Sequence, residues 1–187
     1  MIQVSTDYVF DGTAHIPYKE DCEPCPNSVY GFTKLGGEKE VMQNCEKAMV
    51  IRTAWLYSIY GNNFVKTMIR LGRERESLGV VFDQIGTPTY ANDLAQAIYA
   101  AINQGIVPGI YHFSDEGVCS WYDFTSEIFK QADIKIDVEP VPSKAFLTKA
   151  IRPHNSRMSK KCLDEAGFNR LPAWQDALVR YLQELNM

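Results

Sequence analysis

Short apolar runs recur along the chain, and longer segments with mixed apolar and polar positions separate them. Short runs of aliphatic, aromatic and β-branched residues predict buried strands. These runs cover residues 2–4, 48–53, 78–82, 109–113 and 136–141. Between the third and fourth runs, Gly86 and Pro88 predict a loop over residues 83–90.

The longer segments have the spacing of helices, and most follow a residue that can cap a helix N-terminus. We expect helices to begin after Asn27 or Ser28, after Asn62 or Asn63, near Asn92, after Ser120, near Ser159 and near Pro172. Strands that alternate with helices are typical of a mainly parallel α/β sheet. The last third of the chain is richer in helix, which predicts a lobe beside the sheet.

Composition and charge fit a globular α/β chain and argue against several partners. The 187 residues are 45% hydrophobic and carry a formal net charge of −4. An acidic chain without a basic run is poorly suited to nucleic acid or to an anionic membrane surface. No apolar run has the length of a membrane span, and the N-terminus does not resemble a signal peptide, so we expect a cytoplasmic protein.

The cysteines and the isolated aromatic residues predict structural roles. Five cysteines, an odd number, fit reduced thiols better than a disulfide framework. Cys22 and Cys25 form a lone C-x-x-C without the two further ligands of a zinc site, so we interpret them as loop residues. His112 lies on an apolar strand, and we expect it to be a core histidine, while Trp121 and Trp174 should pack in the helical lobe.

Thr6, Tyr30 and Lys34 form the strongest candidate for chemistry. Tyr30 and Lys34 are four residues apart at the start of a predicted helix, so they share one face. A nearby ammonium favours the phenolate form of tyrosine, which helps the phenol to transfer a proton near neutral pH. Thr6 ends a predicted strand and could hold the oxygen that receives the proton. A Tyr-x-x-x-Lys pair alone is a weak signal, and an isolated match fits a surface pair better than a catalytic one.

The order of further motifs resembles the extended short-chain dehydrogenases/reductases. Within that superfamily the chain is similar to the dTDP-4-dehydrorhamnose reductases. The matching runs are 5–12 (STDYVFDG), 17–20 (PYKE), 29–34 (VYGFTK) with Gly37-Glu38, 52–57 (RTAWLY), 61–64 (GNNF), 83–89 (DQIGTPT), Arg152-Pro153, 155–157 (NSR) and 172–174 (PAW). The resemblance covers nearly the whole chain.

This resemblance implies an activity and a role for individual residues. The family reduces the 4-keto group of a dTDP-4-dehydro-6-deoxy-L-hexose to dTDP-L-rhamnose with NADPH or NADH, and Mg²⁺ also belongs to the family pattern. By resemblance, Tyr30 donates the proton and Thr6 orients the carbonyl. Lys34 favours the phenolate form of Tyr30 and contacts the cofactor ribose. The resemblance also assigns Thr53 to the cofactor and six residues to the substrate. Those six are Asp7, Tyr8, Trp55, Asn63, Gln84 and Arg157. Metal ligands stay unassigned.

The predicted fold is an incomplete Rossmann-like parallel sheet with flanking helices and a smaller C-terminal substrate-binding lobe. We assign 1–60 and 85–105 to the sheet, and 61–84 and 106–187 mainly to the lobe. Neither G-x-G-x-x-G nor G-x-x-G-x-x-G occurs in the chain. We therefore expect about three βαβ units, roughly 90 residues, to be missing at the front. A truncated gene product, a mis-called start or an isolated C-terminal part would each explain this, and NADPH should bind weakly.

Two alternatives to a reductase stay open at this point. The chain could hold a nucleotide sugar or a protein partner without turnover, as a module related to the regulatory subunit of methionine adenosyltransferase. It could also be a non-functional remnant of a larger gene. In each case a shortened parallel sheet leaves an unpaired strand edge, so we expect a homo-oligomer.

Overall fold

A three-stranded parallel sheet forms the centre of the computed structural model, which describes residues 1–145 and 152–185. Its strands are β1 (Ile2–Thr6), β2 (Met49–Thr53) and β7 (Gly109–His112), in the order β1-β2-β7. β2 is buried along its whole length, as expected of the middle strand of a covered parallel sheet. The strands β1 and β2 end together, because Thr6 pairs with Thr53.

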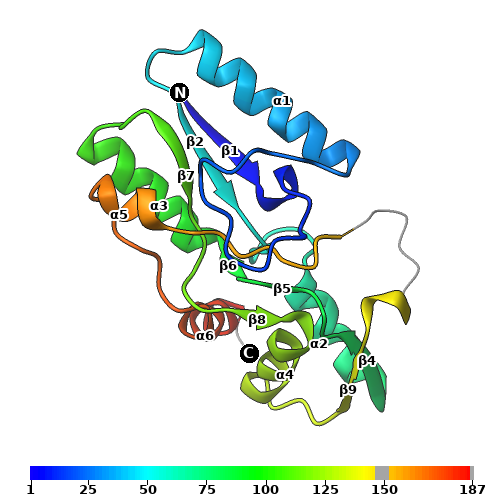
Figure 1. Ribbon diagram of the computed structural model, residues 1–187. Helices are drawn as coiled ribbons and strands as arrows, with labels where there is room; N and C mark the ends of the chain where they lie inside the picture. The colour runs from blue at the N-terminus through cyan, green and yellow to red at the C-terminus, as the bar shows by residue number, and fades with distance from the viewer. Residues whose placement is uncertain (146–151, 186–187) are drawn as a thin grey trace.

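Helices cover both faces of this sheet (Figure 1). α1 (Val29–Asn44) packs on β1 and β2, and α3 (Ala91–Gln104) lies on the opposite side. The apolar contacts under α3 join Met49 and Ile51 of the sheet to Leu94 and Ala101. The short helix α5 (Lys161–Glu165) adds Leu163 to the same core. This arrangement confirms the predicted α/β class with a parallel sheet and flanking helices.

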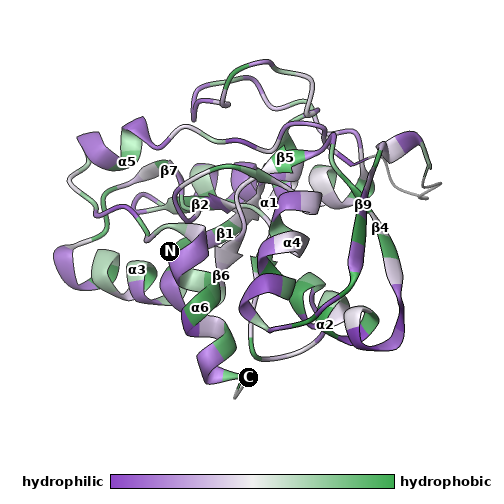
Figure 2. Cartoon of the chain, turned by 90° about the horizontal axis from the view of Figure 1, so that it is seen from below, coloured by the Kyte–Doolittle hydropathy of each residue, from purple (hydrophilic) through white to green (hydrophobic). Residues whose placement is uncertain are grey.

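A second group of elements forms a mostly helical lobe beside the sheet. It contains α2 (Phe64–Glu74), α4 (Trp121–Gln131), α6 (Trp174–Glu184) and the parallel pair β4 (Ser77–Val81) and β9 (Asp137–Val141). Each of its helices carries both hydrophobic and hydrophilic positions, and the buried apolar residues form one continuous core (Figure 2). Three tyrosine rings, of Tyr57, Tyr90 and Tyr181, pack against one another inside it.

Short elements connect the two groups. The 3-10 helix η1 (Asp7–Val9) follows β1, and η2 (Ser143–Ala145) follows β9. β3 (Leu56–Tyr57) pairs with β6 (Thr89–Tyr90), and β5 (Ile85–Gly86) pairs with β8 (Cys119–Ser120). The expectation of an unbroken loop over residues 83–90 was therefore wrong, because two-residue strands from this segment pair with distant parts of the chain.

Three of the expected helix caps are present. The side chains of Ser28, Asn63 and Ser120 each accept a hydrogen bond from a backbone N–H in the first turn of α1, α2 and α4. α3 instead begins after Tyr90, whose side chain makes no capping bond, and Asn92 lies inside the first turn. The proposed division into a sheet part and a lobe stays a prediction. β7 belongs to the sheet, although its residues fall in the range assigned mainly to the lobe.

The segment that follows Arg152 crosses back over the loop that follows β1. Asn155 donates hydrogen bonds from its side chain to the carbonyls of Ala14 and Ile16, at 2.8 and 3.0 Å. The backbone N–H of Tyr18 donates to the carbonyl of Arg157 at 2.9 Å. These contacts join residues about 140 positions apart in the sequence and fix the loop against the sheet. Within the described ranges, no helix combines the length and the apolar character that a membrane span requires.

Candidate functional site

Thr6 lies buried at the carboxyl end of β1, where the chain turns into η1. Its hydroxyl donates to Oδ1 of Asp7 at 3.0 Å and accepts the backbone N–H of Tyr8 at 3.2 Å. The hydroxyl therefore caps η1 and is held at the strand end. The carboxyl ends of parallel strands are where α/β sheets bind ligands.

Tyr30 is the second residue of α1 and faces this strand end. Its ring meets the ring of Tyr8 edge-on, with centroids 5.7 Å apart, and about half of its side chain is exposed. The next residue, Gly31, allows the close approach. A Cβ at Gly31 would lie 2.2 Å from the carbonyl oxygen of Tyr8, which is inside any allowed contact. The glycine thus lets the start of α1 rest directly on η1.

Lys34 follows Tyr30 by one helical turn and is anchored to the same strand. Its Nζ donates to the carbonyl of Val4 at 2.6 Å. Thr6, Tyr30 and Lys34 therefore all border the carboxyl end of β1. The three side chains predicted from sequence spacing therefore lie beside β1 and η1 rather than on separate surfaces.

Two buried polar atoms at this strand end have no hydrogen-bond partner among the described residues. They are Oδ2 of Asp7 and the hydroxyl oxygen of Thr53, at the ends of the neighbouring strands β1 and β2. Burial raises the pKa of Asp7 to about 6, and the nearby hydroxyls of Ser156 and Thr6 partly oppose this shift. Buried polar atoms normally find partners, so unmatched ones at a strand end indicate a place for a ligand or water.

Trp55 follows β2 in a conformation that only a constrained site maintains. Its φ is 50°, in the left-handed region that bulky residues rarely adopt. The indole stacks on Trp121 at a centroid distance of 3.5 Å and an interplanar angle of 9°. Gly86 lies against the ring, since a Cβ there would be 2.7 Å from Cε2 of the indole. The half-buried indole is therefore held rigidly between Trp121 and Gly86, close to the strand end.

A cavity of about 510 Å³ opens beside this stack. Its wall combines apolar side chains from α2 and β4 with Trp121 at the start of α4. Its cationic lining residues are Arg75, Lys144 and Arg152, together with His154, and no carboxylate is among the described residues that line it. Such a lining suits a ligand with a flat or apolar part and a negatively charged part.

The remaining predicted substrate residues lie in three different places. Gln84 is buried and lines the 510 Å³ cavity. The side chain of Asn63 is occupied, because it caps α2 and donates to the carbonyl of Ser58 at 2.5 Å. Arg157 lines a second cavity of about 540 Å³ and donates to the carbonyl of His15 at 2.8 Å. Arg152 and His154 line both cavities. Gln84 and Arg157 therefore line two neighbouring cavities and not a common one.

Sequence reasoning missed the role of Trp121. We expected this residue only to pack in the helical lobe, and it does contact the lobe core, but it also lines the cavity and stacks on Trp55. Its position directly after the capping residue Ser120 could have signalled a helix start beside the strand ends. The interpretation of His112 and Trp174 as interior residues is confirmed, since both are buried.

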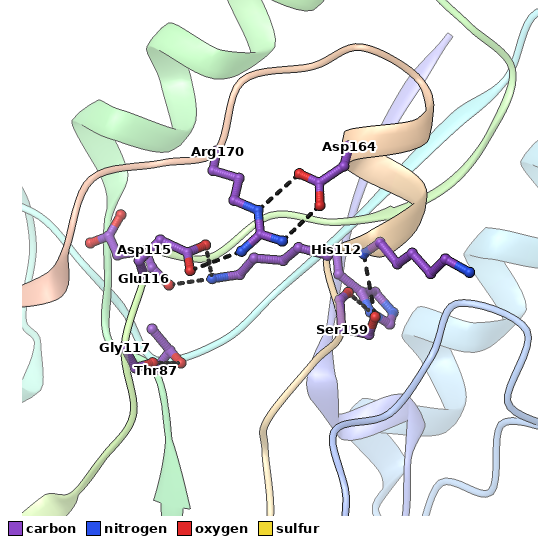
Figure 3. Close-up of polar contacts among 10 residues, drawn as sticks. Thr87, His112, Asp115, Glu116, Gly117, Ser159, Asp164 and Arg170 are labelled. Carbon is purple, nitrogen blue, oxygen red and sulfur yellow. Dashed lines mark hydrogen bonds and ion pairs between the residues drawn. The ribbon is translucent and has the colours of Figure 1, made fainter.

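A polar network fixes the end of β7 to the segment before α5 (Figure 3). Nδ1 of His112 lies 3.0 Å from the carbonyl oxygen of Ser159. Nζ of Lys160 donates to the carbonyl of Asp115 at 2.6 Å and to Glu116 at 2.7 Å. Arg170 then joins Glu116 to Asp164 by ion pairs. None of these residues lines the 510 Å³ cavity.

No set of metal ligands gathers in the described part of the chain. Across residues 1–145 and 152–185, no three side chains of His, Cys, Asp or Glu come together in a way that could hold an ion. The possible Mg²⁺ of the resemblance therefore stays a prediction without assigned residues. The five cysteines are all free thiols, and Cys22 and Cys25 lie in the loop as expected.

Comparison with known proteins shows similarity along the whole chain. Residues 1–187 match the family model of the RmlD substrate binding domain. The chain is 42% identical to the dTDP-4-dehydrorhamnose reductase of Escherichia coli K12, over 99% of this chain and 65% of that protein. It is 40% identical to the spore coat polysaccharide biosynthesis protein SpsK of Bacillus subtilis, over 98% of this chain and 64% of that protein.

Solved structures agree with the sequence relatives. The dTDP-4-dehydrorhamnose reductase of Bacillus anthracis, in complex with NADP, has a TM-score of 0.94 and 44% identity, over 98% of this chain and 65% of that one. The corresponding protein of Clostridium acetobutylicum has a TM-score of 0.96 and 43% identity, over 100% of this chain and 66% of that one. The chain thus spans slightly less than two thirds of the length of the first relatives that it matches.

Proposed function

Because the chain belongs to the RmlD substrate binding domain family, we propose that it provides the proton-donating and substrate-binding part of an NADPH-dependent dTDP-4-dehydrorhamnose reductase. The observation that carries this proposal is the grouping of Thr6, Tyr30 and Lys34 at the end of β1. Trp55, two residues after the end of the neighbouring strand β2, stacks on Trp121, which lines the cationic cavity. The names of the relatives support a reductase over a binding module without turnover.

The proposed chemistry at the strand end is a proton transfer coupled to hydride addition. When bound, NADPH would supply the hydride that adds to the carbonyl carbon of the 4-keto sugar. The phenol of Tyr30 would give its proton to the carbonyl oxygen, which leaves a phenolate that solvent reprotonates. The ammonium of Lys34 would stabilise the phenolate, and the hydroxyl of Thr6 would turn from Asp7 to donate to the same oxygen.

A cofactor can fit here because buried polar atoms at the carboxyl ends of β1 and β2 lack hydrogen-bond partners among the described residues. The hydroxyl of Thr53 is buried and without a partner among the described residues, next to the end of β1. It can donate to, or accept from, a polar group of the cofactor. Because the 187 residues contain no glycine-rich phosphate turn, we expect this chain alone to bind NADPH weakly.

The nucleotide end of the substrate would occupy the 510 Å³ cavity. A base or sugar ring can rest on the apolar wall and on Trp121, while Arg75, Lys144 and Arg152 can contact the diphosphate. Location in the cytoplasm and assembly into a homo-oligomer are further parts of the proposal. The outer edge of β1 is consistent with assembly, because it has no partner strand among the described residues.

The test measures NADPH oxidation with the dTDP-4-keto sugar in the full gene product that contains this chain. Tyr30→Phe and Lys34→Met should each lower turnover on the order of 10²–10⁴-fold, the usual contribution of general acid catalysis. Tyr99→Phe is the matched control, because this tyrosine is 68% exposed on the outer side of α3. Unchanged turnover in Tyr30→Phe would refute the assignment.

A further inference from the structure

A buried ion pair joins the helix that carries Tyr30 to the middle strand of the sheet. Glu38 of α1 and Arg52 of β2 are 2% and 1% exposed. Nε and Nη2 of Arg52 donate to the two carboxylate oxygens of Glu38 at 3.0 and 2.7 Å. This two-point contact fixes both the distance and the rotation between the helix and the strand.

The same carboxylate also holds β1. The hydroxyl of Ser5 donates to Oε1 of Glu38, the oxygen that also accepts from Nε of Arg52. Ser5 and Arg52 are paired neighbours across β1 and β2. A single side chain of α1 therefore contacts both strands one residue before they end at Thr6 and Thr53.

The position of Glu38 along α1 relates it to the proposed proton donor. It follows Lys34 by four residues and Tyr30 by eight, so the three side chains occupy one side of the helix. Rotation of α1 about its axis, or sliding along it, would move all three together. α1 contributes little apolar packing of its own, since its fully buried residues are only Gly31 and Glu38.

The surroundings of Arg52 keep the pair intact. Its guanidinium also donates to the carbonyl of Glu20 at 3.4 Å and lies 5.1 Å from the centre of the Phe10 ring. His112 is the neighbour of Arg52 on β7. Burial and the charge of Arg52 lower the pKa of His112 to about 3, so its ring stays neutral. The histidine therefore does not compete as a cation for Glu38.

We propose that Glu38, held by Arg52 and Ser5, is a positioning residue that sets the placement of Tyr30 and Lys34 over the end of β1. The effect of Glu38 on catalysis rests on the proposed function. The claim that Glu38 maintains the contact between Tyr30 and Tyr8 can be tested without measuring turnover. A helix with little apolar anchorage needs a directional contact to hold one rotation, and the two-point ion pair provides it.

The experiment compares Glu38→Gln with Asp93→Asn. Asp93 lies on α3, on the opposite side of the sheet from α1 (Figure 1), and receives a similar two-point contact from Arg180, with both distances 2.6 Å. Both variants lose a carboxylate bound by arginine, so both should be less stable. Proton NMR of the chain should show the contact between the Tyr8 and Tyr30 rings in the wild type and in Asp93→Asn, and its loss in Glu38→Gln.

A double variant covers the case in which Glu38→Gln fails to fold. Replacing a whole buried ion pair by apolar residues is often neutral for stability. Glu38→Met/Arg52→Met should therefore fold and still lose the ring contact. In the full gene product, the folded variant should lose kcat on the order of 100-fold, as expected for a shift of about 1 Å, with KM for the sugar nearly unchanged.

The outcomes separate the two proposals. A ring contact that persists in folded Glu38→Gln, or in the folded double variant, overturns the positioning role. A ring contact that is lost in Asp93→Asn as well overturns it too, because the effect is then general destabilisation. A wild type without turnover contradicts the proposed function alone, and the NMR comparison still decides the role of Glu38.

Discussion

Gly31→Ala and Gly36→Ala form a pair of substitutions that separates close packing from helix propensity. Both glycines lie in α1, and alanine favours a helix by about 1 kcal/mol over glycine. A Cβ at Gly36 meets nothing within 4 Å, so Gly36→Ala should be stabilising by about 0.5–1 kcal/mol. At Gly31 the Cβ would lie 2.2 Å from the carbonyl oxygen of Tyr8, which is 1.2 Å inside the 3.4 Å of ordinary contact.

The steric overlap at Gly31 determines how much the two variants differ in stability. Forcing one extra carbon into a packed contact costs about 1–3 kcal/mol, so the free energies of unfolding of the two variants should differ by roughly that amount. For a chain of this length, each kcal/mol corresponds to about 2–4 °C in Tm. Urea and thermal denaturation of both variants measure the difference directly. If Gly31→Ala proves as stable as Gly36→Ala, the start of α1 does not rest on η1 as described.

Two further predictions concern the interior and the cavity. Burial and the charge of Asp93 raise the pKa of Asp115 from 3.8 to about 7. The native state then binds a proton that the unfolded state has lost, so the free energy of unfolding falls between about pH 4 and about pH 7, by roughly 2–4 kcal/mol. Asp115→Asn should reduce this fall in urea denaturation, and parallel pH curves would contradict the reasoning. Trp121→Ala should weaken binding of dTDP on the order of 10-fold by calorimetry, as the stacking surface beside the cavity is lost. Tyr99→Ala serves as its control, and equal affinities would place the nucleotide elsewhere.

The parts of the fold that could be predicted from the sequence are those with local signals. Strands β1, β2 and β7 are apolar runs, and α1, α2 and α4 begin at Ser28, Asn63 and Ser120, which cap their own first turns. Each of these features depends on residues within a few positions of one another. The spacing of Tyr30 and Lys34 on one helical turn is local in the same sense.

The features that could not be predicted depend on partners far away in the sequence. β5 and β8 contain two residues each, too few to show an alternating pattern, and they exist because Gly86 meets Cys119. The φ of 50° at Trp55 and its stack on Trp121 follow from the meeting of two segments more than 60 residues apart. The cavity likewise takes its wall from α2, β4, α4 and residues after 140. Nothing in one window of sequence specifies such contacts.

The crossing of residues 153–159 over the loop that follows β1 has a consequence for the order in which the site can form. The amide of Asn155, which donates to the carbonyls of Ala14 and Ile16, is synthesised about 140 residues after the loop that carries them. At about 5–20 residues per second this is a delay of roughly 7–30 s. During translation the loop beside Thr6 therefore lacks these hydrogen bonds until the segment with Asn155 has emerged.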